Sequence, residues 1–218
     1  MHLVLSLVTL FSTAAEPKFT AKVEKVELPE KLAEPIRKLL DDQALVVREG
    51  ENVIMRVWFR TEIPAKANED QVQNGLSYRE IPEGTLVGAL EFPAKFTDYR
   101  KQELAAGVYT LRFAIQPDIG DHTGTAPHTE FCLICPSTVD KDEEMIEKKK
   151  LIEISSKLNE GRHPAVLLLW PNNGKDTSVK IVDKGNGVFV ATIKRAVTTD
   201  GGKTMLGFAV TVAGVRKE

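Results

Sequence analysis

The chain has 218 residues, of which 42% are hydrophobic and 28% are charged, a composition typical of a globular protein that buries a core. Its 29 Lys and Arg residues nearly balance its 31 Asp and Glu residues. The resulting net charge of −2 disfavours both nucleic-acid binding and an acidic disordered tail, and two cysteines exclude a disulfide-rich scaffold.

The N-terminus has the pattern of a secretory signal. Residues 3–11 are apolar except for Ser6 and Thr9, and small residues follow up to Ala15. We expect a signal peptide over residues 1–15, export to the periplasm or the extracellular space, and a single β-rich domain over residues 16–218. The alternatives are a buried first strand and a domain division near residue 137. No later apolar run reaches the roughly 20 residues that span a bilayer, so no integral membrane segment is expected after signal removal.

In the first half of the chain, alternating apolar residues predict strands, listed here by range: 18–27, 43–48, 53–60, 85–92 and 107–115. The strand over residues 53–60 has one apolar face and one mixed face, which predicts a sheet buried on one side. Residues 29–42 have helical spacing, although Pro35 should break or restart that helix. The stretch 64–82 is polar and irregular, and its run over residues 66–71 should be a mobile surface loop.

The second half begins with Phe131, Leu133 and Cys135, which predict another inward strand face. A helix is expected over residues 139–159, with Asp140 and Glu143 forming a capping box. The remaining predicted strands cover residues 165–170, 179–182, 188–194 and 204–212, and the first of these reads as a central strand because it is apolar on both faces. The prediction is a mainly β fold: an antiparallel β-sandwich of about nine or ten strands with two helical additions.

Several segments together resemble a family of uncharacterised secreted bacterial proteins. They are EPIRKLL (34–40), VWFRTEIPA (57–65), EGTLVGALEFP (83–93), AAGVYTLRFAIQP (105–117), GDHTGTAPHTEF (120–131) and GRHPAVLLL (161–169). The resemblance implies an extracytoplasmic β-rich protein and no particular activity. Members often carry Asp-Gly-Asp-His in the loop where this chain has Asp118-Ile119-Gly120-Asp121-His122, so one carboxylate is absent or displaced.

The loop over residues 118–130 concentrates imidazole and carboxylate groups. Its candidate ligands for a divalent transition metal are Asp118, Asp121, His122, His128 and Glu130. His163 could join them from the loop before the 165–170 strand. The spacing matches no established metal motif, and the same polar residues are common in ordinary turns. Both interpretations stay open from the sequence.

Cys132 and Cys135 form a C-x-x-C pattern without the histidine that covalent haem attachment needs. On a strand, an odd offset points the two thiols to opposite faces at a Cα separation of roughly 10 Å, beyond the disulfide limit of about 7 Å. We therefore expect buried, unpaired cysteines. A redox or metal role would require the strand to end at Leu133.

A row of Arg56, Trp58 and Arg60 on one strand is a candidate ligand-binding surface, because indole stacks on sugars and guanidinium binds anions. The alternative is a cross-strand ladder with paired charges. Asp98, Tyr99 and Arg100 could belong to the same surface or form a local turn.

No nucleophile elbow, phosphate-binding loop or dinucleotide fingerprint occurs in the chain. The sequence therefore favours an exported, non-catalytic binding or structural module whose partner is a protein or a glycan. The alternatives are a metal-binding protein or metalloenzyme that uses the 118–130 loop, and a carbohydrate-binding or carbohydrate-active protein.

Overall fold

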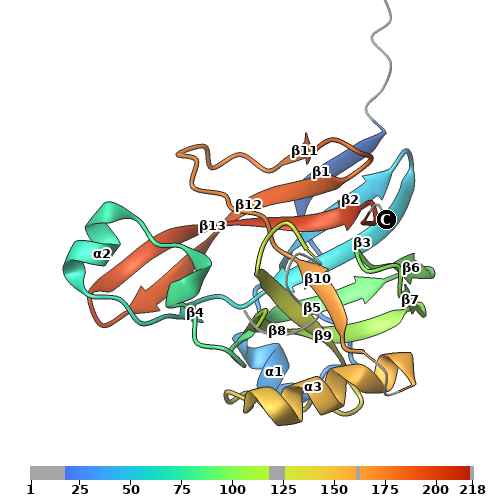
Figure 1. The fold of residues 1–218 in the computed structure, drawn as a ribbon, viewed down its shortest axis with the longest axis horizontal. Helices are drawn as coiled ribbons and strands as arrows, with labels where there is room; N and C mark the ends of the chain where they lie inside the picture. Colours follow the sequence, from blue (N-terminus) through green and yellow to red (C-terminus); the bar gives the residue numbers. More distant parts are fainter. Residues whose placement is uncertain (1–17, 118–125, 161–162, 217–218) are drawn as a thin grey trace, which may run out of the picture.

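The protein is built in three layers (Figure 1). A computed structural model describes residues 18–117, 126–160 and 163–216. A large antiparallel sheet lies in the middle and a smaller sheet packs on one of its faces. Helices α1 (Glu34–Leu39) and α3 (Lys148–Ser156) cover the other face. The predicted mainly β, sandwich-like architecture is confirmed.

Seven strands form the large sheet in the order β1-β2-β3-β5-β8-β9-β10, and every neighbouring pair is antiparallel. Their bounds are β1 (Phe19–Lys25), β2 (Gln43–Glu49), β3 (Asn52–Phe59), β5 (Leu86–Phe92), β8 (Gly107–Ile115), β9 (Glu130–Pro136) and β10 (Ala165–Leu168). Each overlaps a segment that the sequence predicts to be a strand.

The smaller sheet has the order β11-β12-β13, with β4 pairing in parallel to the far end of β12. Its strands are β11 (Lys180–Asp183), β12 (Phe189–Thr199), β13 (Gly202–Ala213) and β4 (Ile63–Pro64). The short strands β6 (Phe96–Thr97) and β7 (Glu103–Leu104) form a hairpin of their own. Apart from the three two-residue strands, the described residues form ten strands, in agreement with the predicted nine or ten.

The helices differ from the prediction in number and length. The described helices are α1 (Glu34–Leu39), α2 (Glu69–Asn74) and α3 (Lys148–Ser156), with 3-10 turns η1 (Tyr78–Glu80) and η3 (Lys157–Asn159). Pro35 lies in the first turn of α1, where its missing N–H costs nothing. The 64–82 stretch, expected as an irregular loop, contains α2, because Asn68 and Gln71 form a reciprocal cap. Within the described part of the chain, no helix is both long and apolar enough to cross a bilayer.

The main core lies between the two sheets. Alternate residues of the large sheet, such as Met55, Val57, Leu111 and Phe113, meet residues of β12 and β13, such as Phe208. Phe59 and Phe208 are in ring contact at 5.3 Å between centroids. These are the faces that period-2 alternation predicts to be buried.

The opposite face of the large sheet is also buried, which corrects the prediction of one-sided burial. Helix α1 packs with Ile36 over Val46 and Trp58. Helix α3 packs with Leu151 and Ile154 over a second apolar group on β8, β9 and β10. Burial of both faces explains why β10 is apolar throughout, although it is the edge strand of its sheet and not the predicted central one. The chain leaves β10 toward β13, where Leu169 bridges Val210.

A fully buried ion pair fixes the segment that leads into α3. Arg112 on β8 donates from Nε and Nη2 to both carboxylate oxygens of Asp140, at 2.9 and 2.8 Å. Its remaining donors bond to the backbone carbonyls of Gly84, Asp142 and Glu144, so the five N–H groups of the guanidinium are all used. Asp140 thus does not cap a helix. Glu147 caps α3 instead, and residues 140–147 wrap around the arginine, which corrects the predicted helix start.

Candidate binding site

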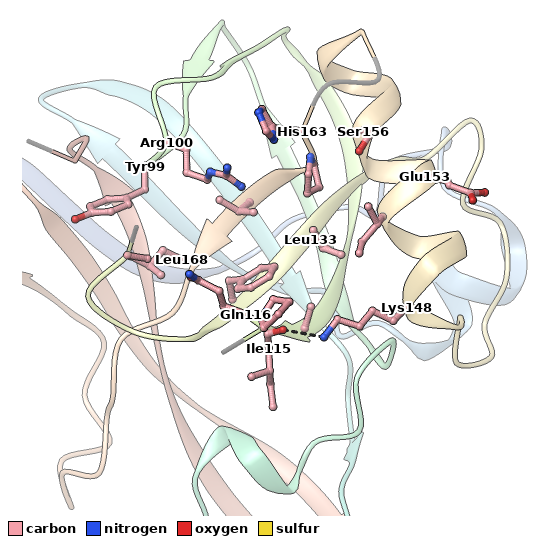
Figure 2. Close-up of a pocket in the computed structure, with 17 residues that line it drawn as sticks. Tyr99, Arg100, Ile115, Gln116, Leu133, Lys148, Glu153, Ser156, His163 and Leu168 are labelled. Atoms are coloured by element: carbon pink, nitrogen blue, oxygen red, sulfur yellow. Dashed lines mark hydrogen bonds between the residues drawn. The ribbon is translucent and has the colours of Figure 1, made fainter. Parts of the chain in front are cut away.

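A cavity of about 630 Å³ opens between α3 and strands β9 and β10 (Figure 2). Its volume lies within the range of small-ligand sites, roughly 300–1,000 Å³. Leu133, Val166 and Leu168 line it from the strands, while Ile152 and Ser156 line it from the helix. We call it the α3 chamber.

Helix α3 covers only part of the apolar strand surface beneath it. Leu151 and Ile154 cover part of the apolar strand surface, and Leu133 and Val166 from the same apolar group also line the chamber. The helix is held firmly above the strands by Ser155, whose Oγ donates toward the carbonyls of Ile134 and Ala165 at 2.8 and 3.1 Å and accepts the Ala165 N–H at 3.0 Å. The walls of the chamber are therefore attached to rigid elements.

A tight turn carries Tyr99 and Arg100 into the opposite wall. The buried Asp98 carboxylate accepts backbone N–H groups of Arg100 at 2.9 Å and Gln102 at 2.8 Å, and that of Val166 on β10 at 3.3 Å. Burial raises the pKa of Asp98 against the opposing effect of these hydrogen bonds. The local-turn interpretation of residues 98–100 is thus confirmed, and the turn is attached to the edge of β10.

The charged groups are distributed unevenly around the chamber. On the α3 side, Lys148 pairs with Glu83 at 2.8 Å and donates to the Ile115 carbonyl at 3.0 Å, and Glu153 points away from the cavity (Figure 2). On the opposite side lies Arg100. The chamber therefore has an apolar interior, a neutralised pair at one end and a cation at the other.

A second cavity, of about 440 Å³, adjoins the chamber, since Tyr99 and Ala126 line both. We call it the Trp170 groove. The Trp170 indole donates from Nε1 to Thr211 at 3.1 Å, its ring meets the edge of His128 at 4.7 Å, and the Lys184 ammonium lies 5.4 Å from its centroid. Arg216 also lines this groove, and its backbone N–H donates to the Tyr99 carbonyl at 2.9 Å.

The structure describes only some of the predicted metal ligands. Asp118, Asp121 and His122 lie outside the described residues. Glu130 pairs with Arg79 at 3.2 Å, whereas His128 packs on Trp170, and burial lowers the pKa of that imidazole. His163 lines the α3 chamber. Among the described residues, no group of three or more metal-binding side chains occurs.

The proposed Arg-Trp-Arg surface is not an exposed stripe. Trp58 is only 1% exposed because α1 covers its face, and its Nε1 donates to the Val26 carbonyl at 3.1 Å. Arg56 pairs with Glu91, its neighbour on β5, at 2.5 Å. Arg60 is half-buried, and burial lowers its pKa. The Trp58 indole is therefore not available to stack on a sugar, and Arg56 forms the alternative cross-strand ladder.

The two cysteines are buried and unpaired on β9, as the strand geometry predicts. Cys132 faces the core between the sheets, and Cys135 faces the α3 layer. Burial raises the pKa of both thiols, so the reactive thiolate is disfavoured.

Sequence reasoning missed both cavities. The available signal was the apolar character of β9 and β10 on both faces, which demands a cover on the second face. Helix α3 covers that face only in part, because Leu133 and Val166 also line the chamber. Trp170, an aromatic residue at the end of an apolar strand, was a second signal that could have indicated a binding surface.

Comparison with known proteins adds no relative: no family model, no curated protein and no solved structure matches this chain. The resemblance to secreted bacterial proteins stays a prediction.

Proposed function

We propose that this protein is a non-catalytic binding module that holds a small, largely apolar ligand in the α3 chamber. The observation that carries the proposal is a preformed apolar cavity whose walls are fixed to the sheet through Ser155 and Asp98. Convergent polar groups at the rim of an apolar pocket are typical of small-molecule sites.

The chemistry of the walls supports binding rather than catalysis. Lys148 forms an ion pair with Glu83, and the Asp98 carboxylate accepts three backbone N–H groups. The structure assigns no base to the Ser156 hydroxyl among the residues that it describes. Nucleophilic catalysis needs a nucleophile within hydrogen-bond reach of a base, and no such pair lines the described walls of the chamber.

The test is a titration with N-phenyl-1-naphthylamine, a neutral apolar dye that fluoresces when it leaves water. We expect saturable binding of about one equivalent, displaced by 1-decanol, because burial of apolar surface drives association. A fluorescence increase that never saturates, or that decanol does not displace, would show that the chamber does not take apolar ligands.

We also propose that the chain is exported, on the strength of the apolar run and small residues over positions 1–15. Expression of the full chain in a bacterial host should yield a mature protein whose N-terminal sequence starts near Glu16. A product that still begins at Met1 would refute export by this segment.

A further inference from the structure

We infer that the natural ligand is a single-chain amphiphile with an anionic head group: its tail lies in the α3 chamber and its head lies beside the Trp170 groove. This inference rests on the proposed function and adds to it the class and orientation of the ligand. It follows from the way charge is distributed over two adjoining cavities.

The two cavities meet at one wall. Tyr99 and Ala126 line both, and the backbone of Tyr99 is tied to the end of β13 through the Arg216 N–H. Because the two cavities adjoin, the polar end of a ligand whose tail lies in the chamber would lie close to the groove. An amphiphile suits this arrangement because apolar side chains dominate the chamber, whereas Lys184, Asn186 and Arg216 line the groove.

Three cations lie around the shared wall, one on the chamber side and two on the groove side. Arg100 lines the chamber next to Tyr99, and Lys184 and Arg216 line the groove. None of the described residues that line the groove is a carboxylate. At the α3 end, by contrast, Lys148 is neutralised by Glu83. Among the described residues, this distribution of charge favours the groove end as the place for an anionic head.

Trp170 gives the groove a fixed surface for that head. Its indole is anchored by Thr211 and supported at its edge by His128, and the Lys184 ammonium is held over the ring. Cation–π attraction favours this position of the exposed ammonium at the cavity wall. A carboxylate or a phosphate would find a positioned cation there, and these two head groups share the chemistry that we assign.

The experiment compares four probes with the same ten-carbon chain as competitors of N-phenyl-1-naphthylamine at pH 8: 1-decanol, decanoate, decyl phosphate and decyltrimethylammonium. We expect decanoate or decyl phosphate to displace the dye at a concentration about fivefold lower than decanol, since two partly exposed cations contribute modestly. Decyltrimethylammonium should be the weakest. The better of the two anions identifies the head group.

A double variant, Lys184→Ala with Arg216→Ala, should bring the anions to within about twofold of decanol while leaving decanol itself unchanged. Lys175→Ala, which removes an exposed lysine outside both cavities, is the matched control and should keep the preference. Equal affinity of decanol and both anions for the unaltered protein would overturn the inference, as would a preference that survives in the double variant. If neither the dye nor decanol binds, the proposed function itself fails, so the two failures are distinguishable.

Discussion

Replacing Asp140 by alanine should lower the free energy of unfolding by about 3 to 5 kcal/mol. The reason is that the variant leaves the Arg112 guanidinium buried without its counter-charge. Arg112 and Asp140 are both at most 1% exposed, so water cannot replace the lost carboxylate without opening the structure. Urea unfolding followed by circular dichroism gives the change in free energy.

Two further variants separate charge from packing. Asp176→Ala breaks an exposed ion pair with Lys180 and should cause a far smaller change. Arg112→Met combined with Asp140→Leu removes both charges and should be less damaging than Asp140→Ala alone, because no buried charge is left unpaired. A loss below about 1 kcal/mol in Asp140→Ala would contradict the assigned role of the pair.

Gly84→Ala should be the second strongly destabilising change, with a loss of more than about 2 kcal/mol. Gly84 has a φ of +87°, and a Cβ built on it would lie 2.0 Å from the carbonyl oxygen of Ile146. The same glycine accepts hydrogen bonds from Arg112 and from the Ile146 N–H, at 3.2 and 3.3 Å. Relief of the clash would therefore move the segment that the ion pair holds.

Gly50→Ala is the matched control, since Gly50 also has a positive φ, +56°, but nothing lies within 4 Å of its Cβ position. It should show only the backbone strain, about 1–2 kcal/mol. Urea unfolding of the two variants, measured side by side, separates strain from clash. Equal losses would mean that the contact between Gly84 and Ile146 does not matter for stability.

The strands could be predicted because their signal is local. Alternation on β3 and β8 identifies the residues that face the core between the sheets, and each of these faces is buried as expected. Burial of the second face of the large sheet was harder to predict from the sequence. Trp58 with its two flanking arginines is equally typical of an exposed row. Only the position of α1 decides that the indole is covered.

The prediction that a helix starts at Asp140 was wrong for a related reason. Asp140 and Glu143 have capping-box spacing, yet the partner of Asp140 is Arg112, twenty-eight residues earlier. Charge pairing over such a separation leaves no periodic trace in the sequence. Most residues in 140–147 are charged, so the segment resembles the first turns of a charged helix. In the structure it surrounds a buried arginine instead.

The candidate site was the least predictable part. The cavity lies where α3, β9, β10 and the Asp98 turn meet, so it depends on contacts between segments that are far apart in the sequence. The sequence instead indicated a candidate site in the 118–130 loop, of which the structure describes only the last residues. His128 belongs there to an aromatic contact with Trp170.

Ligand binding in the α3 chamber is the central proposal for this protein. Ile152→Trp tests this most directly, because Ile152 lines the chamber from a partly exposed position and a larger side chain can fill the cavity without displacing core residues. Met145→Trp places the same side chain at an exposed site outside the chamber and serves as its control. We predict that N-phenyl-1-naphthylamine binds Ile152→Trp at least about tenfold more weakly than the unaltered protein, which corresponds to about 1.4 kcal/mol, and binds Met145→Trp as before. Unchanged affinity in Ile152→Trp, in a protein that still unfolds cooperatively, would contradict the claim.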